Sequence, residues 1–249
     1  MALEAEIDVW TTVLFNKYLA GPADRLLTWI GHPPENPAHP WENWLTMELL
    51  VVAIMIVVFW ILRLRLSVER PGTMQHVAEM LYRFFVDTTN ETMGHGGEKY
   101  VSFFGTIFIF ILFLNLIGSL PGFESPTMTP AVPAGFAVSV FVYYNYMGIR
   151  EHGVFRYFSH FAGPYPLLAP LMIPLEIMSH LARMLSLTVR LYANIFAGDK
   201  VILVFLSLTY VVIPALFQGL HVFVSLLQAY IFMALTILYV GAAVAHEHD

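Results

Sequence analysis

A few charged side chains lie within segments that are otherwise apolar, and their types fit the handling of ions. Arg190 stands in an apolar run, with Glu176 14 residues before it and Asp199 9 residues after it. An arginine at the centre of a membrane helix costs at least about 2.5–3.5 kcal/mol, so it must face protein, water or a counter-ion. Arginine keeps its proton, whereas a carboxyl group in a medium of low dielectric can exchange protons near neutral pH. The three residues therefore predict an ion path.

Further polar residues recur at helical spacing along two long apolar stretches near the C-terminus. One face of the first stretch carries Ser179, Arg183, Ser186, Arg190 and Asn194, and one face of the second carries Gln218, His221, Ser225 and Gln228. If the two stretches form an antiparallel pair that turns near Tyr210, Asp199 lies level with His221. In the same register Arg190 lies close to level with Gln228. His221 could be a core histidine with satisfied hydrogen bonds, or it could carry protons, since histidine changes its protonation near neutral pH.

Each of these residues also has a structural explanation. Asp199 could form a local pair with Lys200 or with His221, Glu176 could be solvated near the membrane surface, and Arg190 could be satisfied by backbone carbonyl groups. Asn115, in an earlier apolar segment, and Ser186 are interpreted as polar packing residues, since such side chains hold membrane helices together by hydrogen bonds.

The composition restricts the class of protein. The chain has 249 residues, of which 58% are hydrophobic and 12% are charged, and its net charge is −6. Soluble domains carry about 25% charged residues, and nucleic-acid binders need a basic face, so both classes are excluded. The absence of cysteine excludes thiolate metal sites and disulfides. No metal site and no cofactor are expected, and the chain carries no nucleotide-binding loop, so we expect no enzyme activity from this chain by itself.

The apolar segments predict an all-α polytopic membrane protein. A spanning helix needs about 20 mostly apolar residues, and five segments satisfy this requirement: 44–62, 101–120, 132–148, 167–208 and 213–244. The last two are too long for a bilayer, which predicts a steeply tilted antiparallel hairpin. Because prolines crowd residues 164–174, its first helix is expected to be continuous only from about Leu175. Segments 9–30 and 74–88 have the mixed pattern of amphipathic interfacial helices.

The distribution of arginine predicts the orientation of the chain. Arginines gather in the loops at 63–99 and 149–165 and are missing from the 121–131 connection and from the turn near Tyr210. Basic loops face the cytoplasm, so the N-terminus is expected outside and the C-terminus inside. Residues 1–43 then form an outside-facing extension with an amphipathic helix, and 44–249 form one membrane domain. The extension favours a bacterial inner membrane.

Three runs in the chain resemble one known family. SLTVRLYANIFAGDK at 186–200, FLNLIGSLPGF at 113–123 and LLQAYIFMALTILYV at 226–240 are similar to motifs of subunit a of the F-type ATP synthase, in the same order and at the same spacings. The resemblance extends from about the first span to the C-terminus. It implies a stator subunit that translocates protons beside a rotating ring of c subunits, with the b-subunit peripheral stalk and membrane lipid as further partners. It implies no nucleic acid, and no small-molecule substrate other than protons.

The resemblance also implies a role for each residue that matches a motif. Arg190 matches the essential arginine that faces the ring carboxylate and prevents a direct leak between two half-channels. Asn194 and Gln228 match positions near that arginine. Glu176, Asp199 and His221 match polar positions of the access channels; the family often has glutamate where Asp199 stands.

Two other functions are possible for such a composition. A self-contained secondary ion transporter usually has internal repeats, and none is found in this sequence. A membrane haem protein would need two facing histidines, but the deep candidates His180 and His221 are about 20 positions out of level in the antiparallel register.

Overall fold

The chain is helical, without strands, throughout the part that the structure describes. The computed structural model describes residues 9–30, 39–67, 71–94, 96–120, 122–155, 157, 169–209 and 212–245. The helices are α1 (Trp10–Ile30), α2 (Asn43–Leu64), α3 (Thr73–Met93), η1 (Gly97–Tyr100), α4 (Val101–Ile117), η2 (Pro126–Met128), α5 (Ala131–His152), α7 (Ala169–Leu208) and α8 (Val212–Val244). Five helical segments in these residues are long and apolar enough to cross a membrane, which confirms the predicted all-α polytopic fold.

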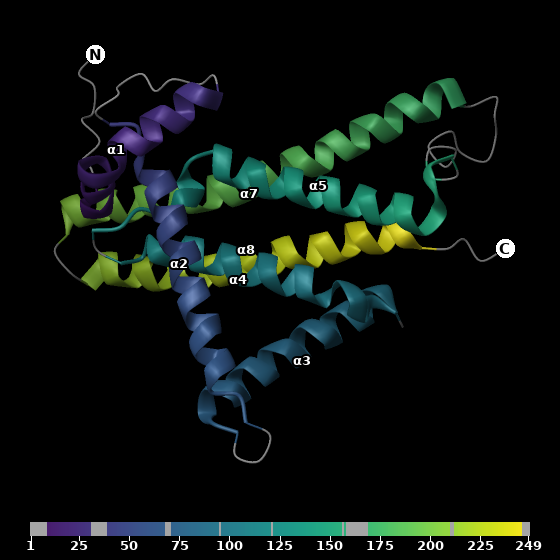
Figure 1. Ribbon diagram of the computed structural model, residues 1–249, viewed down its shortest axis with the longest axis horizontal. Coiled ribbons are helices and arrows are strands. Elements are labelled where there is room, and N and C mark those ends of the chain that lie inside the picture. The colour runs from purple at the N-terminus through teal and green to yellow at the C-terminus, as the bar shows by residue number, and fades with distance from the viewer. Residues whose placement is uncertain are drawn as a thin grey trace.

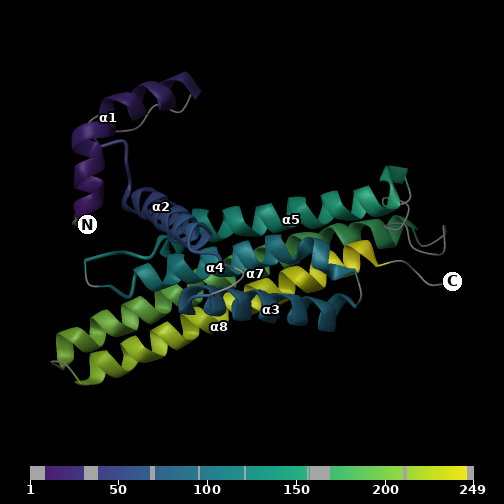
Figure 2. The same ribbon diagram turned by 60° about the horizontal axis from the view of Figure 1, so that its bottom comes forward.

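Four helices lie alongside one another and form the body of the molecule. α4, α5, α7 and α8 run in nearly the same direction, whereas α2 crosses them steeply and α1 lies at one end (Figure 1). In the view turned by 60°, α7 and α8 still lie side by side, and the end of α7 and the beginning of α8 project beyond α4 (Figure 2). The C-terminal ends of α3, α5 and α8 lie at the opposite end of this body.

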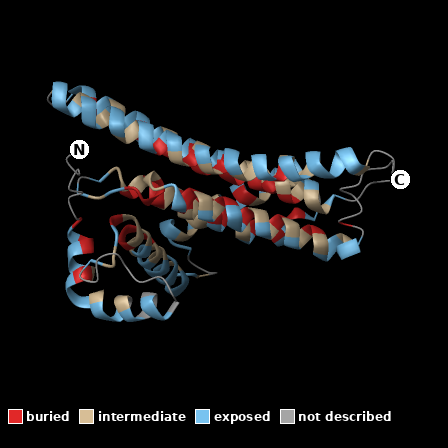
Figure 3. Cartoon of the chain, turned by 90° about the horizontal axis from the view of Figure 1, so that it is seen from above, coloured by how far each residue is buried: buried red, intermediate tan, exposed pale blue. Residues whose placement is uncertain are grey.

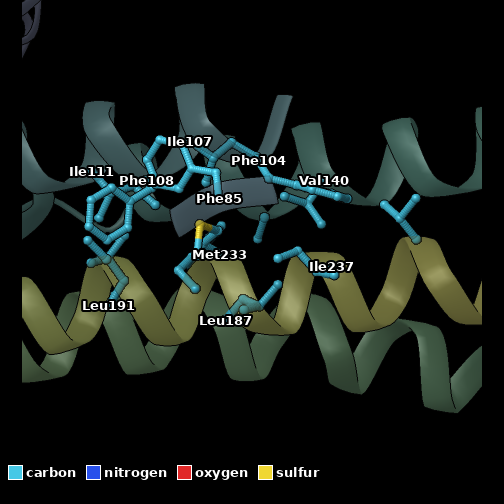
Figure 4. Packing of buried hydrophobic residues seen from close by; sticks show 14 of the residues in the cluster. Phe85, Phe104, Ile107, Phe108, Ile111, Val140, Leu187, Leu191, Met233 and Ile237 are labelled. Atoms are coloured by element: carbon cyan, nitrogen blue, oxygen red, sulfur yellow. The ribbon is translucent and has the colours of Figure 1, made fainter. Parts of the chain in front are cut away.

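Apolar side chains from five helices meet in one core. On α7 the buried residues Leu187, Leu191 and Ile195 recur every four residues, so they form a single stripe that faces the bundle. This stripe packs in one cluster with Phe85 of α3, with residues of α4 and α5, and with Met233 of α8 (Figure 4). The core therefore holds α7 against the bundle along one side only.

The first helix of the hairpin is longer than the sequence predicts. α7 begins at Ala169 instead of Leu175 and continues for 40 residues, with Pro174 inside it. The expected start was wrong because Pro170 lies in the first turn, where its missing N–H has no helical partner, and because Pro174, which removes one hydrogen bond to the preceding turn, is accommodated inside the helix. At 1.5 Å per residue α7 is about 60 Å long, about twice the thickness of a hydrocarbon core. α8, with 33 residues, is also longer than a bilayer requires.

Two other predicted boundaries are corrected. The second span was expected to continue to residue 120, but α4 ends at Ile117, where the chain turns through residues 118–120. The third span was expected to end at residue 148, but α5 continues to His152 and ends at Gly153, which has a φ of 80°. A positive φ suits glycine and stops the helix there.

The two segments predicted to be amphipathic are both helical. α1 is attached to the beginning of α2, since the Thr12 and Thr46 hydroxyl oxygens are 2.6 Å apart and the backbone N–H of Val9 donates to Asn43 Oδ1 at 3.2 Å. α3 inserts Phe85 into the core beside Phe108. Residues 1–8 and 31–38 of the predicted N-terminal extension lie outside the described residues.

Gly118 allows the end of α4 to lie against the following loop. A Cβ atom at this position would stand 2.6 Å from Ser125 Cβ and 2.8 Å from its backbone nitrogen. Ser125 is itself held in place, because its hydroxyl donates to the carbonyl oxygen of Leu114 at 2.9 Å.

Replacement of Gly118 by alanine is expected to lower the stability of the fold. The backbone of Ser125 would have to move, and such overpacking costs about 1–3 kcal/mol. The matched control is Gly135→Ala in α5, where a Cβ atom meets nothing within 4 Å. Thermal unfolding of the detergent-solubilised protein should give a lower Tm for Gly118→Ala alone; equal values for the two variants would contradict this account.

Candidate functional site

Arg190 lies on a polar stripe of α7 that separates its buried side from its exposed side. The exposed side carries apolar residues such as Leu185 and Val189, which are 65% and 50% exposed. Figure 3 shows that exposed residues dominate the helices at the edge of the bundle and that buried ones are confined to their inner sides. Arg190 is half-buried, and its Nη2 donates to Ser186 Oγ at 3.3 Å. Its charge is therefore held at the border of an uncovered apolar surface.

A hydrogen bond joins the two hairpin helices one turn beyond Arg190. Asn194 Nδ2 donates to Gln228 Oε1 at 2.9 Å, and Gln228 is buried. The expected register placed Gln228 close to level with Arg190, but the bond connects it to Asn194. The short side chain of asparagine reaches across to α8, while Arg190 bonds within its own helix.

Asp199 and His221 meet across the hairpin, as the antiparallel register predicts. Asp199 Oδ1 lies 3.5 Å from His221 Nε2, and the His221 residue is only 3% exposed. The alternative partner, Lys200, extends over the ring of Phe196, with its Nζ 5.3 Å from the ring centre. The acid and the histidine therefore form the contact between the helices at this level.

Gly198 makes room for His221. A Cβ atom at position 198 would stand 2.5 Å from His221 Nδ1, which is closer than any real contact of this kind. Gly198 was not among the residues expected at the site, although a glycine inside an apolar helix is a recognisable sign of close packing.

Several buried polar atoms on α8 and α4 have no hydrogen-bond partner among the described residues. They are His221 Nδ1 and Nε2, Ser225 Oγ, Gln228 Nε2, Ser119 Oγ and Asn115 Nδ2. Gln218 Nε2 donates to the carbonyl oxygen of Ser119 at 3.3 Å, which connects the end of α4 to the same face of α8. Buried polar atoms are normally hydrogen-bonded, so a row of this kind is a favourable environment for water.

Asn115 belongs to the packing of α4. It is fully buried, and its Oδ1 accepts a hydrogen bond from Thr127 Oγ1 at 2.8 Å. The hydroxyl oxygens of Thr127 and Ser125 are 2.8 Å apart. This network fits the structural interpretation of Asn115 that the sequence favours.

A second acid–histidine pair lies toward the other end of α7. Glu176 Oε1 is 3.3 Å from His180 Nε2, and the His180 ring also contacts Tyr144 of α5. The sequence assigned His180 no role in the ion path, but the residue is only 8% exposed. The spacing of four residues between Glu176 and His180 on one helix indicates this contact from the sequence. No local sequence pattern indicates the contact between His180 and Tyr144.

The two histidines are too far apart to share a haem. His180 precedes Arg190 on α7, whereas His221 lies beside Asp199, 19 residues after His180 along the same helix. At 1.5 Å per residue this separation is about 28 Å. Within the described ranges, no group of three or more histidine, aspartate or glutamate side chains could hold a metal ion.

Comparison with known proteins identifies the family. The profile of the ATP synthase A chain matches residues 45–241. The chain is 60% identical to ATP synthase subunit a of Solibacter usitatus over 94% of its length and all of that protein. It is 45% identical to the protein of the same name from Koribacter versatilis, over 97% of this chain and 98% of the relative. The counterpart from Campylobacter jejuni is 40% identical, over 79% and 88%. This chain therefore belongs to the ATP synthase subunit a family.

Proposed function

We propose that this chain translocates protons through the membrane sector of an F-type ATP synthase and couples their flow to rotation of a ring of c subunits. The observation that carries the proposal is the position of Arg190. Its charge lies at the border of the exposed apolar side of α7, with an acid–histidine pair on each side of it along the helix. An exposed apolar surface that contains a fixed cation suits a partner with an apolar wall and a carboxylate.

Arg190 would act through its permanent charge. When a ring carboxyl group arrives opposite the guanidinium, the positive charge favours the carboxylate and displaces its proton. The same charge repels a free proton that would otherwise pass from one access route to the other. The hydrogen bond from Arg190 to Ser186 would orient the guanidinium toward the partner.

The first access route would run between α7 and α8. Asp199 and His221 supply groups that exchange protons, and the unpaired buried atoms of Ser225, Gln228 and Ser119 would bind water between them. Asn194, which holds Gln228, lies between this region and Arg190. In the expected orientation this route opens outside the cell, because the α7–α8 turn has no basic residues.

The second access route would end near Glu176. A protonated, neutral ring site can enter lipid and rotate almost a full turn before it loses its proton on this side. One charge that crosses the membrane yields about 2.3 kcal/mol per 100 mV, so several protons are needed for each ATP. ATP is made by partner subunits in this scheme, with the b-subunit stalk as the stator connection and a bacterial inner membrane as the location.

Replacement of Arg190 by alanine should abolish proton-driven ATP synthesis while the complex still assembles. Without the guanidinium, no positive charge would stabilise the ring carboxylate when its proton leaves. The electrostatic barrier that keeps protons from passing directly between the two access routes would also be lost. ATP synthesis in inverted membrane vesicles, with the amount of assembled complex measured in parallel, checks this. Lys200→Gln, which removes a charge from the same helix, is the control and should keep its rate. Synthesis at the normal rate by Arg190→Ala would refute the role.

Exchange of Asp199 and His221 tests their pairing. Each single replacement, Asp199→His or His221→Asp, puts two like groups together and should reduce passive proton conduction by the membrane sector. The double variant restores one acid and one histidine at the contact and should recover part of that loss. A double variant that conducts no better than the worse single variant would argue against a functional pair.

Gly198→Ala should reduce proton conduction without removal of any polar group. The added Cβ atom would displace the imidazole of His221 from its position beside Asp199. Gly219→Ala on α8, where a Cβ atom meets nothing within 4 Å, is the matched control. Conduction in vesicles stripped of the catalytic head is the measurement, and equal conduction by both variants would show that the position of His221 is unimportant.

A further inference from the structure

His180 is held between an acid of its own helix and a phenol of α5. Its Nε2 lies 3.3 Å from Glu176 Oε1, and its Nδ1 shares a short hydrogen bond with the Tyr144 hydroxyl. The imidazole also stacks on the Tyr144 ring, with the ring centres 5.5 Å apart and the planes inclined by 15°. Each nitrogen of this buried ring thus faces a polar group of a neighbouring side chain.

The partners of the two nitrogens determine which one carries the proton. An ionised carboxylate can only accept hydrogen bonds, so Nε2 must donate to Glu176. In the neutral imidazole Nδ1 is then an acceptor, and it receives the hydrogen of the Tyr144 hydroxyl. Tyr144 therefore selects the tautomer that presents an N–H group to Glu176.

Further charged and titratable groups lie around the ring. Among the described residues they are Glu176 and Arg183 of α7 and Tyr144 of α5, and Tyr239 of α8 lies against Arg183 and Tyr144. The Arg183 guanidinium is 5.2 Å from the centre of the Tyr239 ring. In its neutral form His180 presents one N–H group to Glu176.

We propose that His180, oriented by Tyr144, is a positioning residue for proton release at Glu176. This inference rests on the proposed role of Glu176 in the second access route. An N–H group held against the carboxylate stabilises its ionised form, so a proton that reaches Glu176 is passed on to water. The Glu176 side chain is 42% exposed, which leaves its other oxygen accessible to water. The proton moves from the carboxyl group to water, and His180 keeps its own proton throughout.

The same contacts could serve only to join α5 to α7, and this purely structural role makes a different prediction. A structural role would change the amount or stability of the complex but would leave the pH dependence of conduction unaltered. A positioning role changes the pH at which Glu176 releases its proton. The pH profile is therefore the measurement that separates the two.

The test uses the whole complex in membrane vesicles stripped of the catalytic head, with passive proton conduction measured against pH on the Glu176 side. His180→Asn removes the N–H group at the Nε2 position, and His180→Gln retains one near it. The midpoint of the profile should rise by about one pH unit in His180→Asn, as expected for the loss of one hydrogen bond to a charged group. It should remain close to the wild-type value in His180→Gln.

Tyr144→Phe keeps the stacked ring and removes the hydroxyl group that donates to Nδ1. The proton of His180 is then no longer restricted to Nε2, so the midpoint should rise, as in His180→Asn. This variant decides the question if His180→Asn fails to assemble. Unshifted midpoints in Tyr144→Phe and in every assembled His180 variant would overturn the inference.

Glu176→Gln separates failure of this inference from failure of the proposed function. If Glu176→Gln conducts like the wild type, the proposed release role of Glu176 is wrong, and the role of His180 falls with it. If Glu176→Gln lowers conduction while the His180 and Tyr144 variants keep the wild-type midpoint, the role of Glu176 stands and the positioning role is wrong. A double variant, Glu176→Gln with His180→Asn, should conduct no less than Glu176→Gln alone.

Discussion

The antiparallel register of α7 and α8 is the constraint on which every other contact of the site depends. The buried stripe of α7, with Leu187 and Leu191, packs beside Met233 and Ile237 of α8 in the common core. A slip of one residue would rotate one helix face by about 100° relative to the other and would separate Asp199 from His221. Because close-packed apolar side chains resist such a slip, dispersion and burial in the core set the geometry of the charged groups.

The sequence predicted the parts of the structure that depend on spacing along one helix or on one short turn. The five apolar spans, the polar stripe of α7 and the level position of Asp199 and His221 are all of this kind. Tyr144 and His180, which are in contact, stand 36 residues apart in sequence on two different helices, and no periodicity within either helix indicates their contact. The start of α7 was misjudged because Pro170 falls in the first turn and Pro174 is accommodated inside the helix, which a count of prolines cannot convey.

The polar groups of the hairpin are distributed differently on its two helices. On α8 they are buried, and several keep hydrogen-bonding capacity that no described side chain uses. On α7, apart from the buried His180, they are half-buried or exposed and border an apolar side that none of the described residues covers. The buried set suits small, mobile occupants such as water and protons, whereas the uncovered set suits a large partner with its own apolar wall.

The exposed apolar side of α7, with Arg190 at its border, affects the stability of the subunit before the complex assembles. A subunit alone in the bilayer exposes Arg190 next to lipid, at a cost of at least about 2.5–3.5 kcal/mol that water drawn into the hydrocarbon can only partly offset. Membrane domains are marginally stable, so a penalty of this size raises the population of locally opened forms on which proteases act. The order in which subunits are inserted, and the delay before this chain binds its partner subunits, should therefore affect the fraction of the chain that escapes proteolysis in the cell.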